Sequence, residues 1–190
     1  MGFLDPLLGR RKTKASAPDR LFAITTAYVG LEAQQSITTQ GAAAIVFQPL
    51  ATGDFQQIIA DVEETVRGTG QETGTGVETH DEEFSYRWVI LRDPDLDDLA
   101  VGVNAVSDAL AIGGYKDRVL CAVFSFKDAN DKPLYFIYNY KRGTWYPFVP
   151  MPGDKQRSTE RELQIKAIVG PELPIEGDLE RWFPLWGIPI

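Results

Sequence analysis

The residue types that most often carry out chemistry are scarce in this sequence. Its single histidine, His80, precedes three acidic residues at positions 81–83. An imidazole beside carboxylates can hold a metal ion, but a tetrahedral site needs further histidine or cysteine ligands, and none stands nearby. We therefore interpret His80 as a solvated side chain in a polar loop, and we expect neither a metal site nor another cofactor.

A second acidic cluster has the spacing that begins a calcium-binding loop. Asp93, Asp95 and Asp97 alternate along the chain, as the first ligands of such a loop do. The loop also needs glycine at its sixth position and glutamate at its twelfth, where this sequence has Asp98 and Asn104. The cluster is better explained as the start of a helix, whose dipole favours acidic side chains.

Neither the glycine-rich run nor the single cysteine forms a catalytic motif. Glycines fall at 68, 70, 74 and 76, but no Gly-Lys-Ser/Thr follows, and the run comes after a predicted helix, the reverse of a phosphate-binding loop. Cys121 lies in an apolar β-like run with no evident base, which is typical of a core residue. Because the sequence offers no catalytic constellation, we expect a binding protein rather than an enzyme.

Composition and charge argue against a membrane-spanning, a secreted or a nucleic-acid-binding protein. Apolar residues make up 44% of the 190 residues, enough for a sizeable core. No run reaches the roughly 20 apolar residues of a membrane-spanning helix, the start lacks the order of a secretory signal, and a single cysteine cannot form an internal disulfide. These features favour a cytoplasmic protein. Residues 15–190 carry 15 basic and 26 acidic side chains, and this negative excess argues against nucleic-acid binding.

Hydrophobic spacing predicts both helices and strands. Helices are expected at 19–36, from Asp54 onward, from Asp93-Pro94 to Gly113, from a Thr159/Glu162 capping box to 170, and in a short turn at 178–183. Strands are expected at 42–48, 84–91, 119–126, 134–140 and 144–149. The polar residues 68–83 are interpreted as an exposed loop.

This order of elements predicts the α+β class. We expect a single compact domain over residues 18–190, with a largely antiparallel sheet and helices packed around it. The sheet would include a three-stranded meander in the C-terminal half. Residues 1–17 would form a separate apolar and basic tip with a linker.

The N-terminal tip has the composition of an interfacial anchor. Its apolar residues fall on one side of a short helix and basic residues follow at once, which suits binding to an anionic membrane surface or to a partner. The anchor residues would be Phe3, Leu4, Leu7, Leu8, Arg10, Arg11 and Lys12. Two other interpretations remain open: a disordered tail, or a tip packed on the protein's own core.

The C-terminal end is unusually aromatic, and tryptophan and arginine are favoured anchors in protein interfaces. If exposed, it could contribute to an interaction patch made of Arg142, Trp145, Trp182, Phe183 and Trp186. The simpler interpretation is that the C-terminal aromatic residues are buried against the meander.

Several segments together resemble the PspA-associated protein family PspAB. They are the start MGFLDPLLGR, the run YNYKRGTWYPFVP at 138–150, the ending DLERWFPLWGIPI at 178–190, and the helix at 95–114 followed by the strand RVLCAVFSF. The resemblance implies a cytoplasmic accessory protein of the phage-shock, or envelope-stress, system. Its neighbours would be PspA, a membrane-binding helical protein, and often a membrane metalloprotease resembling HtpX. It implies no catalytic residues.

Three hypotheses about function follow. The first is a non-enzymatic adaptor that binds a PspA-like protein, and the inner face of the membrane through residues 1–14. The second is a module similar to the type III secretion chaperones, with a client in an apolar cleft lined by Trp145, Trp182 and Trp186. The third is a small-molecule binder or an enzyme with a deep pocket that gathers Arg142, Tyr138 and carboxylates.

Overall fold

The computed structural model describes residues 17–82, 86–153 and 155–190, and it has the predicted α+β architecture. Its helices are α1 (Ala17–Gln35), α2 (Gly53–Thr73), α3 (Leu96–Ile112) and α4 (Thr159–Val169), with short 3-10 turns η1 (Lys116–Arg118) and η2 (Leu179–Arg181). Its strands are β1 (Thr38–Phe47), β2 (Gly76–Asp81), β3 (Arg87–Arg92), β4 (Val119–Lys127), β5 (Pro133–Asn139), β6 (Thr144–Phe148), β7 (Pro150–Met151) and β8 (Gln156–Arg157).

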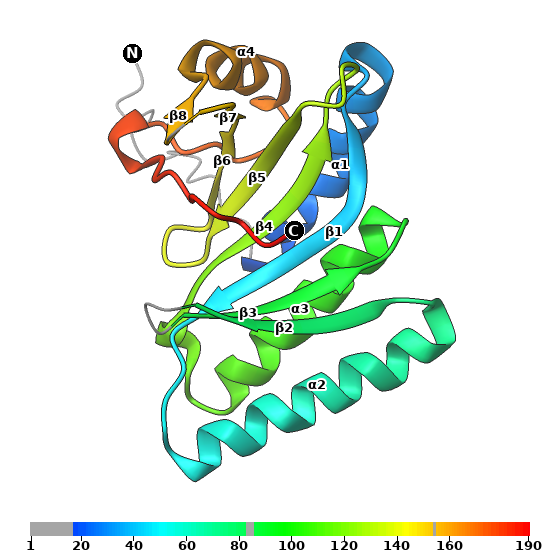
Figure 1. Ribbon diagram of the computed structural model, residues 1–190, viewed down its shortest axis with the longest axis vertical. Helices are drawn as coiled ribbons and strands as arrows, with labels where there is room; N and C mark the ends of the chain where they lie inside the picture. Colours follow the sequence, from blue (N-terminus) through cyan, green and yellow to red (C-terminus); the bar gives the residue numbers. More distant parts are fainter. Residues whose placement is uncertain (1–16, 83–85, 154) are drawn as a thin grey trace, which may run out of the picture.

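Six of these strands form one antiparallel sheet in the order β2-β3-β1-β4-β5-β6, and β7 pairs with β8 in a separate small hairpin. The predicted meander is confirmed as β4, β5 and β6, which are consecutive both in sequence and in the sheet. Helices α1, α2 and α3 lie against one face of the sheet (Figure 1). α3 contacts both α1 and α2, so it is the central helix of this layer.

The two faces of the sheet bury different side chains, because neighbouring residues in a strand point to opposite sides. On β4, Ala122, Phe124 and Phe126 belong to the core under the helices. Val123 belongs to a second, smaller core on the other face, with Cys121 packed against it. The sheet is therefore covered on both sides, which explains the long apolar runs in its central strands.

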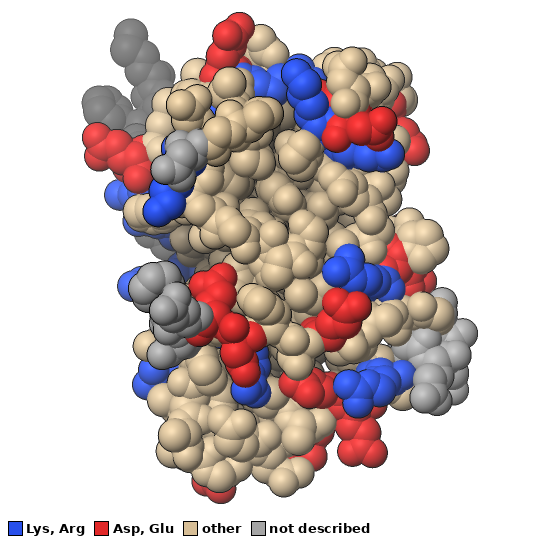
Figure 2. All heavy atoms as spheres, in the orientation of Figure 1, with Lys and Arg blue, Asp and Glu red and all other residues tan. Residues whose placement is uncertain are grey.

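The second face is covered by the C-terminal segment, residues 182–190, which runs across it in an extended form (Figure 1). Trp182, Leu185, Trp186, Ile188 and Ile190 all pack against this face. Figure 2 views the molecule from the same side and shows a broad uncharged area with charged side chains along its margins. The interpretation that the aromatic end is buried against the meander is thus confirmed for Trp182, which is 4% exposed.

The predicted loop at 68–83 is wrong. Helix α2 continues to Thr73, and β2 follows at Gly76–Asp81 as an edge strand paired with β3. Five of the six β2 residues are exposed, so the strand has no apolar alternation by which its sequence could be recognised. Pairing with β3 holds it instead, helped by ion pairs from Arg92 to Glu78 and from Arg87 to Asp81. The predicted strand at 84–91 is observed at Arg87–Arg92; residues 83–85 lie outside the described part of the chain.

Helix α3 is the element that the sequence predicted best. Its buried residues are spaced as expected: Leu96, Leu99, Ala100, Val103, Val106 and Leu110. The helix begins two residues later than Asp93-Pro94 suggested, because Asp95 is the N-cap and accepts a hydrogen bond from the amide of Asp97 at 2.8 Å. Asp93 is buried, and its carboxylate accepts hydrogen bonds from the Asp95 amide and the Thr75 hydroxyl.

Candidate binding groove

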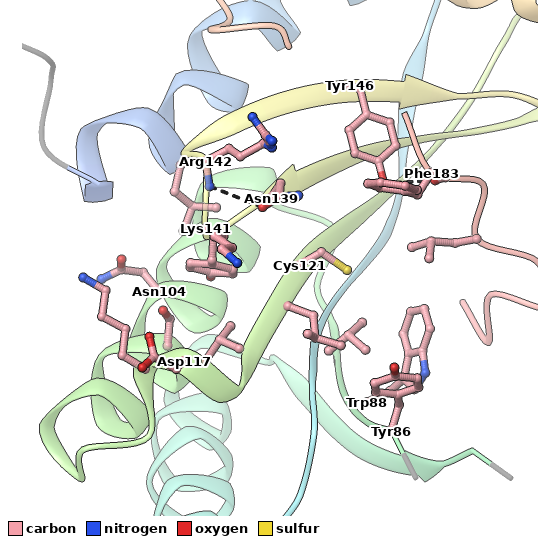
Figure 3. Close-up of a pocket in the computed structure, with 18 of the residues that line it drawn as sticks. Tyr86, Trp88, Asn104, Asp117, Cys121, Asn139, Lys141, Arg142, Tyr146 and Phe183 are labelled. Carbon is pink, nitrogen blue, oxygen red and sulfur yellow. Dashed lines mark hydrogen bonds between the residues drawn. The ribbon is translucent and has the colours of Figure 1, made fainter. Parts of the chain in front are cut away.

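A groove of about 1290 Å³ lies where the sheet meets the C-terminal segment (Figure 3). Its lining comes from segments far apart in the sequence. They include α1, strands β1 and β3, α3, η1, the start of β4, the β5–β6 hairpin and the C-terminal segment. Aromatic and apolar side chains from β3, β4 and the C-terminal segment meet polar and charged side chains from α3, η1 and the turn. The groove is therefore amphipathic.

The C-terminal segment forms one wall of the groove and is fixed by side chains of the sheet. The hydroxyl of Tyr146 donates to the carbonyl of Phe183 at 3.0 Å, as Figure 3 also shows. Trp186 packs edge-on against Phe148, with ring centroids 5.2 Å apart. The Phe183 side chain stays 56% exposed, so this wall presents an aromatic ring to solvent.

The segment is held at its start by Trp182. The Trp182 ring stacks on Tyr146 with a centroid separation of 6.3 Å, and its indole N–H donates to the carbonyl of Glu176 at 3.1 Å. The carbonyl of Trp182 accepts a hydrogen bond of 2.6 Å from Arg157 Nη1. These contacts fix the position from which Phe183 and the following residues enter the groove.

The β5–β6 turn, residues 140–143, forms another part of the rim. Gly143 has φ of +65°, a left-handed conformation that favours glycine. Arg20 of α1 donates to the carbonyls of Arg142 and Gly143 at 3.3 Å each, which ties the turn to the helix layer. The Arg142 guanidinium lies 3.6 Å from the carboxylate of Glu176. The cationic side chain of Arg142 is thus held at the rim of the same groove whose wall contains Phe183.

Three of the titratable side chains that line the groove have raised pKa values. Burial, with a smaller contribution from the charge of Glu82, raises the pKa of the Cys121 thiol from 9.0 to about 12. Burial also raises the pKa of Tyr140 and of Tyr146. These groups therefore keep their protons at neutral pH and offer no ready nucleophile or base. Within residues 17–82, 86–153 and 155–190, no group of three or more His, Cys, Asp or Glu side chains could hold a metal ion.

The predicted interaction patch is divided by the sheet. Arg142, Phe183 and Trp186 line the groove, but Trp145 does not, and its place in an exposed patch was wrong. Trp145 is 0% exposed on the helix side, where it packs against Phe124 and its indole donates to the carbonyl of Arg20 at 2.7 Å. Trp182 is buried on the opposite side.

This division removes two arrangements considered from the sequence. The three tryptophans proposed to line a client cleft do not share a surface, because Trp145 faces the helices and Trp182 and Trp186 face away from them. Tyr138 is also buried under the helices and is 0% exposed, so it does not join Arg142 in a pocket. In both arrangements, a strand residue that faces the helices, Trp145 or Tyr138, was combined with residues that lie elsewhere.

The sequence missed several residues that complete the groove, among them Tyr86, Trp88 and Leu120. The alternation of Tyr86 and Trp88 indicated that they share a face. It gave no sign that this face meets the C-terminal segment about 100 residues later in the sequence. The predicted anchor residues between Phe3 and Lys12 lie outside the described part of the chain. Among the helices that the structure describes, none has the length and apolar character to cross a membrane.

Comparisons with known proteins agree with the resemblance noted in the sequence. A family model described as PspA associated protein B matches residues 1–190, the whole chain. Searches of curated proteins and of solved structures returned no match. The chain therefore belongs to the PspA-associated protein B family, PspAB, which associates it with the phage-shock system.

Proposed function

We propose that this protein is a non-enzymatic adaptor of the phage-shock system that binds a segment of a PspA-like protein in the groove. The observation that carries the proposal is the exposed ring of Phe183 on the wall of a groove that also contains Trp186 and Arg142. Aromatic residues and arginine dominate the binding energy of protein interfaces. The family description, PspA associated protein B, supports the choice of a PspA-like protein as the partner.

The size of the groove also favours a polypeptide ligand. Small-molecule pockets usually measure about 300–1,000 Å³ and enclose most of their ligand, whereas this groove has a volume of about 1290 Å³. Its mixed lining suits an amphipathic segment whose apolar side chains meet Trp186 and Tyr86, while its polar side chains face η1 and the β5–β6 turn. The high pKa of Cys121 supports a binding role over a catalytic one.

Binding of the purified partner tests the proposal. Affinity for a PspA-like protein would be measured by biolayer interferometry with the full chain, with Phe183→Ala and with Arg142→Ala. Removing a central anchor typically costs 2 kcal/mol or more, so we expect each variant to bind about 30-fold more weakly. Val29→Ala is the matched control, because Val29 is 68% exposed on α1 and does not line the groove.

Binding that is equally strong in all four proteins would refute the groove as the site. Complete absence of binding by the unaltered chain would instead refute the choice of partner. Circular dichroism of each variant separates loss of binding from loss of fold. Both substituted groove side chains are exposed, so we expect the folded structure to persist.

Attachment to the membrane through residues 1–14 is a second part of this proposal. The sequence of Phe3, Leu4, Leu7 and Leu8 followed by Arg10 to Lys14 supports it. Flotation on anionic vesicles, with the intact chain and with one lacking residues 1–14, tests it. We expect only the intact chain to float, and less of it as salt rises. If neither floats, residues 1–14 are not an autonomous anchor.

A further inference from the structure

The negative charge of this protein is concentrated in the helix layer. Within their bounds, α1, α2 and α3 contain ten acidic and two basic residues. Their net charge of −8 equals that of the whole chain, so the remaining residues are balanced. A layer of this kind attracts a basic segment and repels an anionic surface.

The helix layer also exposes one large apolar side chain close to where α2 and α3 meet. Ile112, the last residue of α3, is 88% exposed. Beside it, Gly113 packs so closely on Ile58 of α2 that a Cβ at Gly113 would collide with the Ile58 Cδ1. Asp54 and Asp61 are exposed one turn to either side of Ile58 on α2. Asp108 is exposed one turn before Ile112 on α3, where it also lines the groove.

This corner combines an uncovered isoleucine with negative charge, and the N-terminal segment has the complementary composition. Residues 3–8 contain four large apolar side chains, and residues 10–14 contain four basic ones. The acidic corner would pair with the basic residues, and Ile112 would cover part of the apolar tip. Such a match in both charge and hydrophobicity is what a docking surface requires.

The chain length and the point of attachment allow this contact. Sixteen residues precede Ala17, where α1 begins, and fully extended they span about 50 Å. Arg20, in the first turns of α1, lines the same groove as Asn104, Asp108 and Ala111 of α3. Ile112 directly follows Ala111, which lines the groove. The whole of α3 is only about 25 Å long. The segment can reach the whole exposed side of α3.

We propose that residues 3–14 of this chain dock on the acidic corner formed by Asp54, Asp61, Asp108 and Ile112. Attachment to the same chain gives the segment a high effective concentration, so contacts that are individually weak suffice to hold it. The same weakness makes the docked segment displaceable by an anionic membrane. The apolar tip would then be shielded until a membrane competes for it. This inference does not depend on the groove binding PspA.

Crosslinking of the full chain tests the contact directly. In a Cys121→Ala background, Leu8→Cys would be combined with Ile112→Cys or, as the control, with Met151→Cys, an exposed position on β7. With a short bis-maleimide reagent, we expect at least about fivefold more intramolecular product from the Ile112 pair, because only docked chains hold the two thiols together. The excess should be lost in about 1 M salt, where the screening length falls to about 3 Å. Equal yields from the two pairs would overturn the proposal.

Neutralising the three carboxylates tests whether the N-terminal segment binds this corner specifically or is attracted to the acidic protein as a whole. Asp54→Asn, Asp61→Asn and Asp108→Asn together should reduce the Ile112 crosslink about fivefold and increase flotation on anionic vesicles. The matched control is Glu160→Gln, Glu172→Gln and Glu180→Gln, which removes the same charge from exposed positions outside helices α1–α3. If both triple variants behave alike, the corner is not the docking site. Affinity for PspA, measured on a chain lacking residues 1–14, reports on the adaptor proposal separately.

Discussion

Arg157 and Glu162 form an ion pair that joins the C-terminal segment to the sheet. Arg157 Nε donates to both carboxylate oxygens of Glu162, at 2.9 and 3.0 Å, and Glu162 is 0% exposed. The same carboxylate accepts the amide of Val149 at 2.9 Å, while Arg157 Nη1 reaches the carbonyl of Trp182. One buried pair thus connects α4, the end of β6, the β7–β8 hairpin and the start of the groove wall.

We expect Glu162→Ala to lower the free energy of unfolding strongly, because it breaks the Arg157–Glu162 pair. The substitution removes the carboxylate that pairs with the mostly buried Arg157 guanidinium and accepts the Val149 amide, and breaking such a pair typically costs about 3 kcal/mol or more. Urea unfolding followed by tryptophan fluorescence would measure it. The control is Glu160→Ala on the same helix, where an exposed side chain should change the free energy of unfolding by less than about 0.5 kcal/mol. Equal midpoints for the two variants would contradict this account.

The two aromatic residues on the groove wall should behave differently when they are shortened. Trp186→Ala removes the ring packed on Phe148 and uncovers part of the second core, so it should cost about 2 kcal/mol of stability and increase binding of the dye ANS. Phe183→Ala should change stability by less than about 0.5 kcal/mol, because its ring is already largely exposed. Urea titration of both variants checks this. The reverse order of stability would show that Phe183, not Trp186, supports the wall.

The Cys121 thiol should cause the stability of the folded protein to fall as the pH rises above about 9. Its pKa is about 12 in the folded state and 9.0 in the reference state, so between these pH values the unfolded chain releases a proton that the folded chain retains. Stability then falls as pH rises, by up to about 1.4 kcal/mol per pH unit. Between pH 8 and 10.5, the unaltered protein should lose about 1–2 kcal/mol more than Cys121→Ala.

Chemical denaturation at several pH values would measure that difference. Buried tyrosines such as Tyr146 shift stability in the same direction, but they are present in both proteins and cancel. Parallel pH profiles for the two proteins would show that the Cys121 thiol ionises in the folded state as readily as in the unfolded state.

Gly143→Ala should loosen the β5–β6 turn that carries Arg142. A Cβ at Gly143 would displace the Arg20 guanidinium, the end of a flexible side chain, from the carbonyls of Arg142 and Gly143. The positive φ adds strain of about 1 kcal/mol. Gly114→Ala is the matched control: φ is +85° there as well, but a Cβ would meet nothing within 4 Å. Because only the Arg20 hydrogen bonds distinguish the two sites, we expect Gly143→Ala to cost about 1 kcal/mol more than the control, and thermal unfolding of the two variants would measure this. A smaller cost at Gly143 would mean that Arg20 moves aside freely.

The elements that the sequence predicted correctly are those whose signal is local. Helix α3 was evident because its apolar residues recur on one face and Gly113 ends it. The strands of the meander were evident because short polar turns separate apolar runs. The PspAB family was also recognised from the sequence, through its two ends and its meander, and the match over residues 1–190 confirmed it.

Other assignments failed because they depend on neighbours that are distant in the sequence. Thr159 and Glu162 suggested a capping box, yet Ser158 is the N-cap and Glu162 turns inward to meet Arg157. Strand β2 was missed because its partner β3 and its cross-strand ion pairs stabilise it rather than its own apolar residues.

The sequence by itself determined the fold class, the family and the aromatic content of the C-terminal end. Only the tertiary structure decided that Trp145 and Trp182 lie on opposite sides of one sheet and that Phe183, Trp186 and Arg142 meet at a groove. The physical reason is that periodicity states which residues of an element share a face. Which partner covers that face follows from sheet order and from the path of the last nine residues, and both arise from contacts between distant parts of the chain.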